Sequence, residues 1–113
     1  MPAQRNLEHP EPEDLVLTDV LFALSDPVRL DIVRQLASGP LVAMSCQALT
    51  PDLAKSTRSH HLKTLREAGV VSNVPHGRER MVSLRRDALD ARFPGLLDSV
   101  LAAAPAHQPA ART

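Results

Sequence analysis

Apolar residues recur at helical spacing in two segments near the start of the chain. In residues 13–24 they form a wide apolar surface. A short helix needs a narrower apolar surface to cover a single core, so we expect part of this surface to meet another subunit. The next helix has four inward positions, namely Val28, Ile32, Val33 and Leu36. Asp26 and Pro27 predict its start, because Asp26 can accept hydrogen bonds from free backbone donors and proline suits the first helical position. Gly39 and Pro40 predict its end.

The most informative pattern is LAKSTRSHHLKTLREAG, residues 53–69, where one helix has two different faces. Leu62 and Leu65 are three residues apart and can pack inward. Basic and hydroxyl residues gather near the amino end, as they do in a helix that reads DNA. Before this segment, residues 45–49 predict a brief helix and residues 50–52 a tight turn. Two helices joined by a tight turn form a helix-turn-helix.

The remaining segments add a small β component. Residues 70–74 and 80–84 have strand composition, and residues 75–78 between them supply turn residues, which predicts a hairpin with arginines at its tip. Residues 41–44 are compatible with a further short strand. Pro94 permits a last helix whose apolar stripe is Leu96, Leu97, Val100 and Leu101. The predicted fold class is mainly α with a small β-hairpin, arranged as a winged helix-turn-helix.

Composition bounds the architecture and the location. A chain of 113 residues makes one domain and leaves no room for a deep enclosed active site. We expect a disordered, Pro- and acid-rich arm at residues 1–12, the domain at 13–104 and a flexible tail at 105–113. The single cysteine, Cys46, excludes an internal disulfide, and no apolar run reaches the ~18 residues of a membrane span. Because the start also lacks a signal-peptide core, a cytoplasmic protein without membrane partners is the expectation.

Charge is segregated along the chain although the formal net charge is zero. Residues 54–86 carry eight Lys and Arg against two Glu, whereas residues 1–20 carry one Arg against five acidic residues. A basic middle of this kind favours a nucleic-acid partner, which the net charge alone would argue against. With two Phe and neither Trp nor Tyr, the chain is poorly equipped to stack on single strands, so duplex DNA is the expected partner.

Three motifs in order resemble a known family. They are LSDPVRLDIV at residues 24–33, SHHLKTLREAGVV at 59–71 and HGR at 76–78, and together they resemble the winged helix-turn-helix repressors of the ArsR/SmtB type over roughly residues 15 to 101. The resemblance implies a homodimer paired through its first and last helices, with a recognition helix in each major groove and a wing beside the phosphate backbone. It also implies repression that is released when an effector binds.

Candidate DNA contacts follow from side-chain chemistry. Basic groups can neutralise phosphates and short hydroxyl side chains can approach bases, which selects Lys55, Ser56, Thr57, Ser59, His60 and Lys63 in the helix and Arg78 and Arg80 in the wing. Any one of these residues can equally be solvated surface. Arg58 departs from the family pattern, since it shares a face with Leu62 and Leu65. Its stem either lies along the core edge with the head in water, or it pairs with an acid such as Asp52.

The effector is open at this stage. Metal-sensing relatives have a Cys-x-Cys pair where this chain keeps only Cys46, too few sulfurs for thiolate capture of arsenic, cadmium or lead. Nickel or zinc could use imidazole and carboxylate groups, with His9, Cys46 and His107 as candidate ligands. Alternatively, His9 and His107 are inert polar ends, and Cys46 is a buried apolar residue or a thiol sensor. Adjacent His60 and His61 cannot easily share one ion, because they lie about 100° apart on a helix.

We therefore expect a homodimeric, sequence-specific repressor that binds an inverted repeat in double-stranded DNA and responds to a small effector. The expected dimer interface comprises Leu15, Val20, Leu21, Leu97, Val100 and Leu101. The alternative is a winged-helix module that binds another protein through its first and last helices. An enzyme is not expected, because the chain has no Gly-rich phosphate loop, no metal triad and no nucleophile with a spaced base.

Overall fold

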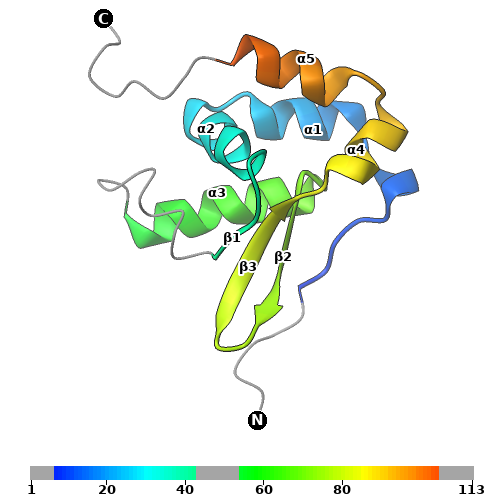
Figure 1. The fold of residues 1–113 in the computed structure, drawn as a ribbon. Coiled ribbons are helices and arrows are strands. Elements are labelled where there is room, and N and C mark those ends of the chain that lie inside the picture. The colour runs from blue at the N-terminus through cyan, green and yellow to red at the C-terminus, as the bar shows by residue number, and fades with distance from the viewer. Residues whose placement is uncertain (1–6, 43–53, 105–113) are drawn as a thin grey trace, which may run out of the picture.

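The computed structural model describes residues 7–42 and 54–104. Within them a short 3-10 turn η1 (Pro12–Asp14) precedes the helices α1 (Leu17–Leu24), α2 (Pro27–Leu36), α3 (Lys55–Glu67), α4 (Arg86–Arg92) and α5 (Leu96–Ala103). Strands β1 (Leu41–Val42), β2 (Val71–His76) and β3 (Glu79–Leu84) form one antiparallel sheet in the order β1-β3-β2. In Figure 1, α5 lies above α1 and α2, α3 lies below them, and the β2–β3 hairpin extends downward. The predicted mainly helical fold with a hairpin is confirmed.

The second helix begins where the sequence predicts. Asp26 is its N-cap, and its Oδ1 accepts hydrogen bonds from the backbone N–H groups of Val28 at 2.7 Å and Arg29 at 3.1 Å. These bonds satisfy two donors that the first turn of a helix leaves without partners. Ile32, Val33 and Leu36 are buried as expected. The helix ends at Leu36, three residues before the predicted Gly39.

The first predicted helix is shorter than expected. The chain makes η1 and then runs extended through Leu15 and Val16, so α1 starts only at Leu17. The reason is tertiary, because Leu15 is 1% exposed and its side chain lies over Gly69, at the end of α3. Arg92 of α4 fixes the same stretch by donating from Nε to the Leu15 carbonyl at 3.1 Å.

The hairpin is longer than its sequence pattern indicated. Strand pairing continues to the pair formed by His76 and Glu79, which leaves a two-residue loop of Gly77 and Arg78. Gly77 has φ +65, the positive value that such tight hairpin loops require at their first central position. The short strand predicted at 41–44 is seen as β1, antiparallel to β3. The helix and turn predicted at 45–52 lie outside the described residues.

The core is aliphatic, and all five described helices and the sheet contribute to it. Its fully buried members include Val20 and Ala23 of α1, Ile32 of α2, Leu65 of α3 and Val82 of β3. No helix of the described residues has the length and apolar character that a membrane crossing needs.

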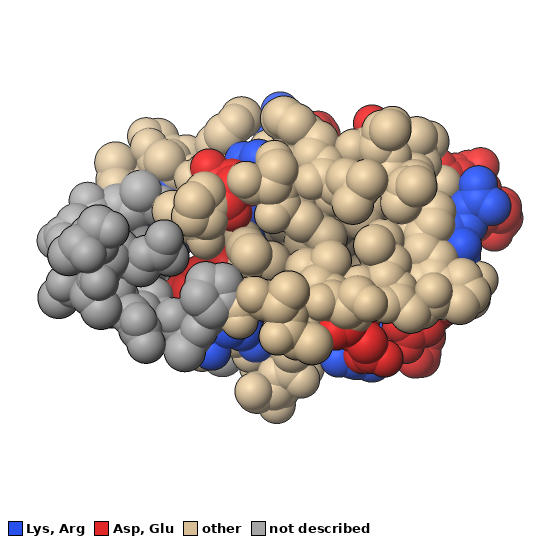
Figure 2. Space-filling view, turned by 90° about the horizontal axis from the view of Figure 1, so that it is seen from above, with Lys and Arg blue, Asp and Glu red and all other residues tan. Residues whose placement is uncertain are grey.

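The expected dimer interface is wrong at three of its six residues. Leu15, Val20 and Leu97 are at most 2% exposed within a single chain, because they fill its own core, and so they offer no surface to a partner. Leu21 is 43% exposed, and Val100 and Leu101 are half-buried. The apolar residues that α1 exposes are instead Leu17, Leu21 and Phe22, with Phe22 64% exposed. Figure 2 looks down on this side of the molecule and shows a broad face without Lys, Arg, Asp or Glu, which lie around its edges.

Gly69→Ala is expected to destabilise the protein strongly. A Cβ at residue 69 would lie 2.0 Å from Leu15 Cδ2, and the backbone has φ +86, where L side chains are strained. Gly77→Ala is the matched control, since it has φ +65 but nothing within 4 Å of the new Cβ. We expect Gly77→Ala to cost about 1–2 kcal/mol and Gly69→Ala at least ~2 kcal/mol more, measured by urea denaturation. Equal losses would contradict the packing of Leu15 against Gly69.

Candidate nucleic-acid interface

Helix α3 divides into a buried and an exposed side. His61, Leu62 and Leu65 are buried, with exposed fractions of 8%, 7% and 0%. The six helical residues predicted to contact DNA are all exposed: Lys55, Ser56, Thr57, Ser59, His60 and Lys63. The structure therefore presents to solvent side chains of the kinds that contact base edges and phosphates.

The amino end of α3 adds to this surface. Its N-cap residue, Ala54, makes no side-chain hydrogen bond to the first turn, and that turn contains no acidic residue. The first N–H groups of a helix carry a partial positive charge, which Lys55 reinforces. Arg58, one turn further on, is half-buried, consistent with a stem along the core edge. Asp52, its alternative partner, lies outside the described residues.

The two wing arginines occupy different environments. Arg78 is exposed in the hairpin loop, where a side chain can reach a DNA backbone. Arg80 is half-buried in β3 and donates to Asn73 of β2, from Nε to Oδ1 at 2.9 Å and from Nη2 to the carbonyl oxygen at 2.6 Å. Burial, followed by the positive charge of Arg66, lowers the pKa of Arg80. Arg80 thus links the two strands of the hairpin through its hydrogen bonds to Asn73. The sequence did not predict this contact within the hairpin.

Part of the expected mobile arm makes defined contacts. The Asn73 N–H, on the free edge of β2, donates to His9 Nε2 at 3.0 Å, and Arg66 of α3 donates from Nη1 to the Glu8 carbonyl. Residues 7–11 therefore connect the end of α3 to β2. The sequence had predicted a disordered arm for residues 1–12, so these contacts are a difference from that prediction. Neither partner carries a sequence signal, because the contacts join residues 58 and 64 positions apart.

His9 is neutral in this arrangement. Its Nε2 accepts a hydrogen bond from the backbone N–H of Asn73, so that nitrogen cannot also carry a proton. Burial lowers the pKa of His9 most, and the positive charges of Arg66, Arg85 and Arg80 act in the same direction, against a hydrogen bond with the Leu7 backbone that raises it.

The predicted metal candidates do not form a site within the described residues. No group of three or more His, Cys, Asp or Glu there could hold an ion. Nε2 of His9 is already engaged by Asn73. Cys46 and His107 lie outside the described residues.

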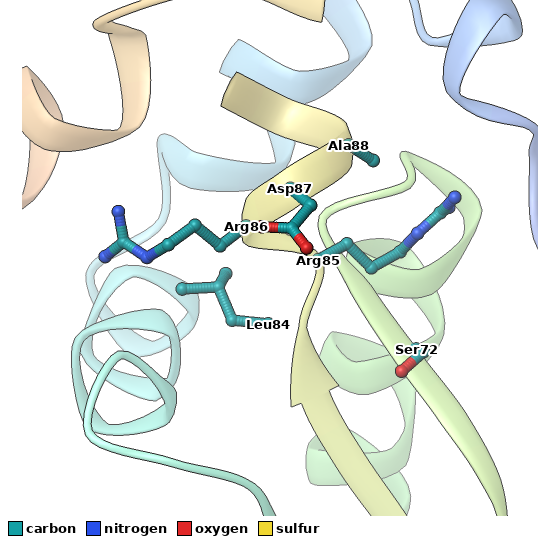
Figure 3. Close-up of a pocket in the computed structure, with 6 residues that line it drawn as sticks. All are labelled: Ser72, Leu84, Arg85, Arg86, Asp87 and Ala88. Atoms are coloured by element: carbon teal, nitrogen blue, oxygen red, sulfur yellow. The ribbon is translucent and has the colours of Figure 1, made fainter. Parts of the chain in front are cut away.

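A cavity lies where the hairpin joins α4. Its volume is about 440 Å³, and it is lined by Ser72, Leu84, Arg85, Arg86, Asp87 and Ala88. Figure 3 shows Arg85 and Arg86 extending in opposite directions, with Asp87 between them. Arg86 Nη1 lies 3.0 Å from Asp98 Oδ1, which ties α4 to α5. Positively and negatively charged side chains therefore both line the cavity. It lies at the base of the hairpin, away from the exposed loop.

Comparison with known proteins identifies the family. The model of the bacterial regulatory protein family arsR matches residues 26–73, which run from the N-cap of α2 into β2. The uncharacterized HTH-type transcriptional regulator YceK of Bacillus subtilis is 36% identical over 89 residues, which cover 78% of this chain and 89% of that protein. The chain belongs to the arsR family of bacterial transcriptional regulators.

Further arsR-family relatives agree. The arsenical resistance operon repressor of Staphylococcus xylosus is 36% identical over 75 residues, covering 66% of this chain and 70% of that protein. The crystal structure of a possible transcriptional regulator for arsenical resistance has a TM-score of 0.60 and 34% identity, covering 72% of this chain and 82% of that one. This arsR-family protein is thus a transcriptional regulator built on a DNA-binding winged helix-turn-helix fold, and its relatives are regulators rather than enzymes.

His9→Gln tests the contact between the arm and the wing in this arsR-family regulator. A lowered pKa means that the folded state resists protonation, so its stability is complete above the ordinary imidazole pKa of about 6.5 and falls as the pH drops below that value. An amide oxygen accepts from Asn73 at any pH. We expect the wild type to lose about 1 kcal/mol more than His9→Gln between about pH 7 and about pH 5.5, measured by urea denaturation. Equal losses would show that the contact adds nothing to stability.

Proposed function

We propose that the protein is a homodimeric repressor that binds an inverted-repeat operator through α3 and the β2–β3 hairpin. The observation that carries the proposal is the asymmetry of α3, which buries Leu62 and Leu65 and exposes the six residues predicted to contact DNA, from Lys55 to Lys63. With two copies related by a two-fold axis, the half-sites would lie about one helical turn, ~34 Å, apart.

Fluorescence anisotropy on the duplex upstream of the protein's own gene tests the proposal. A scrambled duplex serves as the control, and both are titrated at near-physiological salt and at higher salt. We expect preference for the native duplex and a steep loss of affinity with salt, because phosphate contacts release counterions. If the native duplex shows no preference, selection from random duplexes distinguishes a distant operator from the protein-binding alternative. Binding that ignores salt would contradict the proposal.

Helix and wing are expected to contribute differently. Ser59→Ala or His60→Ala should weaken the cognate duplex more than the random one, by about 1–3 kcal/mol for a lost base contact. Arg78→Ala should weaken both duplexes about equally, since a phosphate contact carries no sequence information. Equal losses for all three variants would refute base reading by α3.

The dimer is proposed to form through the exposed apolar side of α1 together with α5. Leu17 and Leu21 are one helical turn apart and Phe22 adjoins them, so α1 exposes a continuous apolar strip. Val100 and Leu101 lie half-buried on α5. Unpaired apolar surface of this kind on both ends of the chain fits an isologous interface.

Leu21→Glu is expected to weaken the dimer at least ~tenfold, because it places a charge in an apolar interface. Val74→Glu is the matched control, since Val74 is 41% exposed against 43% for Leu21 and lies on the hairpin instead. Sedimentation velocity over a concentration series measures both. A wild-type monomer, or an unchanged dimer in Leu21→Glu, would contradict this interface.

We include an effector in the proposal, with nickel and zinc as the first candidates, since imidazole and carboxylate ligands suit both metals. The described residues do not assemble such a site. A metal would have to draw on Cys46, His107 or a second subunit. Adding nickel, zinc or an oxidant to the anisotropy experiment tests the idea, because an effector changes the affinity for the operator.

A further inference from the structure

The buried cation Arg29 joins three helices, since it belongs to α2 and contacts residues of α1 and α3. Arg29 of α2 is 7% exposed. Its Nε donates to the Ala23 carbonyl at 2.7 Å, its Nη2 donates to the Phe22 carbonyl at 3.3 Å, and its Nη1 lies 3.2 Å from Nδ1 of His61. In Figure 1 these elements lie next to one another, with α1 and α2 above α3.

The position of this guanidinium is tightly constrained. None of the ion pairs among the described residues involves Arg29, so its charge is balanced by dipoles rather than by a carboxylate. The two carbonyls belong to the last turn of α1, the end of a helix that carries partial negative charge. A buried charge without these partners would be costly, so the carbonyls and the imidazole must stay where the guanidinium can reach them.

His61 completes this arrangement only when it is neutral. A guanidinium nitrogen can only donate, so Nδ1 of His61 accepts and the ring proton resides on Nε2. His61 belongs to α3, between His60 and Leu62, and is itself 8% exposed. The hydrogen bond therefore joins the recognition helix, directly beside its proposed DNA-contacting residues, to the end of α1.

The guanidinium also lies near the side chain of Phe22, which belongs to the exposed strip of α1. The Arg29 Cζ lies 5.2 Å from the centroid of the Phe22 ring, within range of a cation–π interaction. Phe22 is 64% exposed on the face that we assign to the dimer. A continuous line of contacts thus runs from Phe22 through Arg29 to His61, and desolvation of Phe22 by a second subunit strengthens its interaction with the cation.

We propose that Arg29 and His61 are positioning residues for DNA recognition, which set the orientation of α3 against α1 and connect the subunit interface to the DNA-reading surface. The proposal rests on the proposed function. It assigns to the pair a role beyond stability, because the same contacts that satisfy the buried cation also place Ser59 and His60.

The pair also gives DNA recognition a pH dependence. Around His61 lie the guanidinium of Arg29 from α2, the carboxylate of Asp26 at the start of α2 and the imidazole of His60 on its own helix. Burial lowers the pKa of His61 most, and Arg29 and His60 add to this effect while Asp26 opposes it. Protonation removes the acceptor from Arg29, so recognition is complete above about pH 6.5 and is lost as the pH falls below that value.

Three variants of the full chain separate positioning from stability. His61→Asn keeps an acceptor near the place of Nδ1 and cannot titrate, His61→Leu removes the acceptor, and the double variant R29M/H61L removes both polar partners. Replacing both partners by apolar groups can be nearly neutral for stability. Arg34→Met is the control, since Arg34 also lies on α2 but is held by an ion pair with Asp31 at 3.0 Å.

Anisotropy on the selected and scrambled duplexes gives the ratio of affinities for each folded variant. We expect His61→Leu and the double variant to lower this ratio at least ~tenfold, and His61→Asn and Arg34→Met to stay within about threefold of the wild type. Between about pH 7 and about pH 5.5 the ratio should fall for the wild type more than for His61→Asn. A folded double variant with the wild-type ratio, or identical pH profiles for the wild type and His61→Asn, would overturn the proposal.

Amide hydrogen exchange without DNA keeps this proposal distinct from the proposed function. We expect His61→Leu, and Leu21→Glu at the subunit face, to accelerate exchange in α3 more than in β2 and β3. Uniform acceleration throughout the chain would show that the pair only stabilises the fold and would overturn the proposal. If the wild type binds no duplex while His61→Leu and Leu21→Glu still accelerate exchange selectively in α3, the repressor is refuted and the connection between α1 and α3 is supported.

Discussion

The arrangement of the helices depends on satisfying the buried charge of Arg29. Its donors need the last carbonyls of α1 and the imidazole of His61, so three helices must meet at one point. Apolar packing of Ile32 and Leu65 close by is strong but non-directional, and side chains of similar volume could pack in several ways. The N–H donors of a guanidinium have a fixed planar geometry, so hydrogen bonds to them allow far fewer orientations of the helices. Directional bonds and apolar burial together define where the recognition helix lies.

The surface of α3 that we propose to read DNA is consequently held in place by the contacts of the helix beneath it. The buried side of α3 fixes the helix, and its exposed side is left free for a partner. At its carboxyl end, Gly69 allows Leu15 to approach closely, and Arg66 and His9 connect the helix to the wing through the chain before α1. The contacts at the middle and at the carboxyl end of α3 come from different parts of the sequence, so this helix and the hairpin keep a defined relation to each other.

Charge and apolar surface are separated in a way that suits a dimeric regulator. The exposed residues proposed to contact DNA belong to α3 and the hairpin, whereas the exposed apolar strip belongs to α1. A net charge of zero is misleading here, because residues 54–86, which include α3 and the hairpin, carry eight Lys and Arg against only Glu67 and Glu79. The separation allows a second subunit to cover one face without obstructing the other.

The sequence by itself determined the elements whose signals are local. The N-cap at Asp26 and the two-sided pattern of α3 depend on residues a few positions apart, and both are found as predicted. The turn residues around Gly77 also act locally, although the loop that they form is shorter than predicted. Tertiary structure alone decided that Leu15, Val20 and Leu97 fill the core of one chain, since burial depends on elements distant in sequence. Periodicity could have placed His61 on the buried side with Leu65, four residues later. Its partner Arg29, 32 residues away, became evident only because folding brings the Arg29 guanidinium against both the end of α1 and the His61 ring.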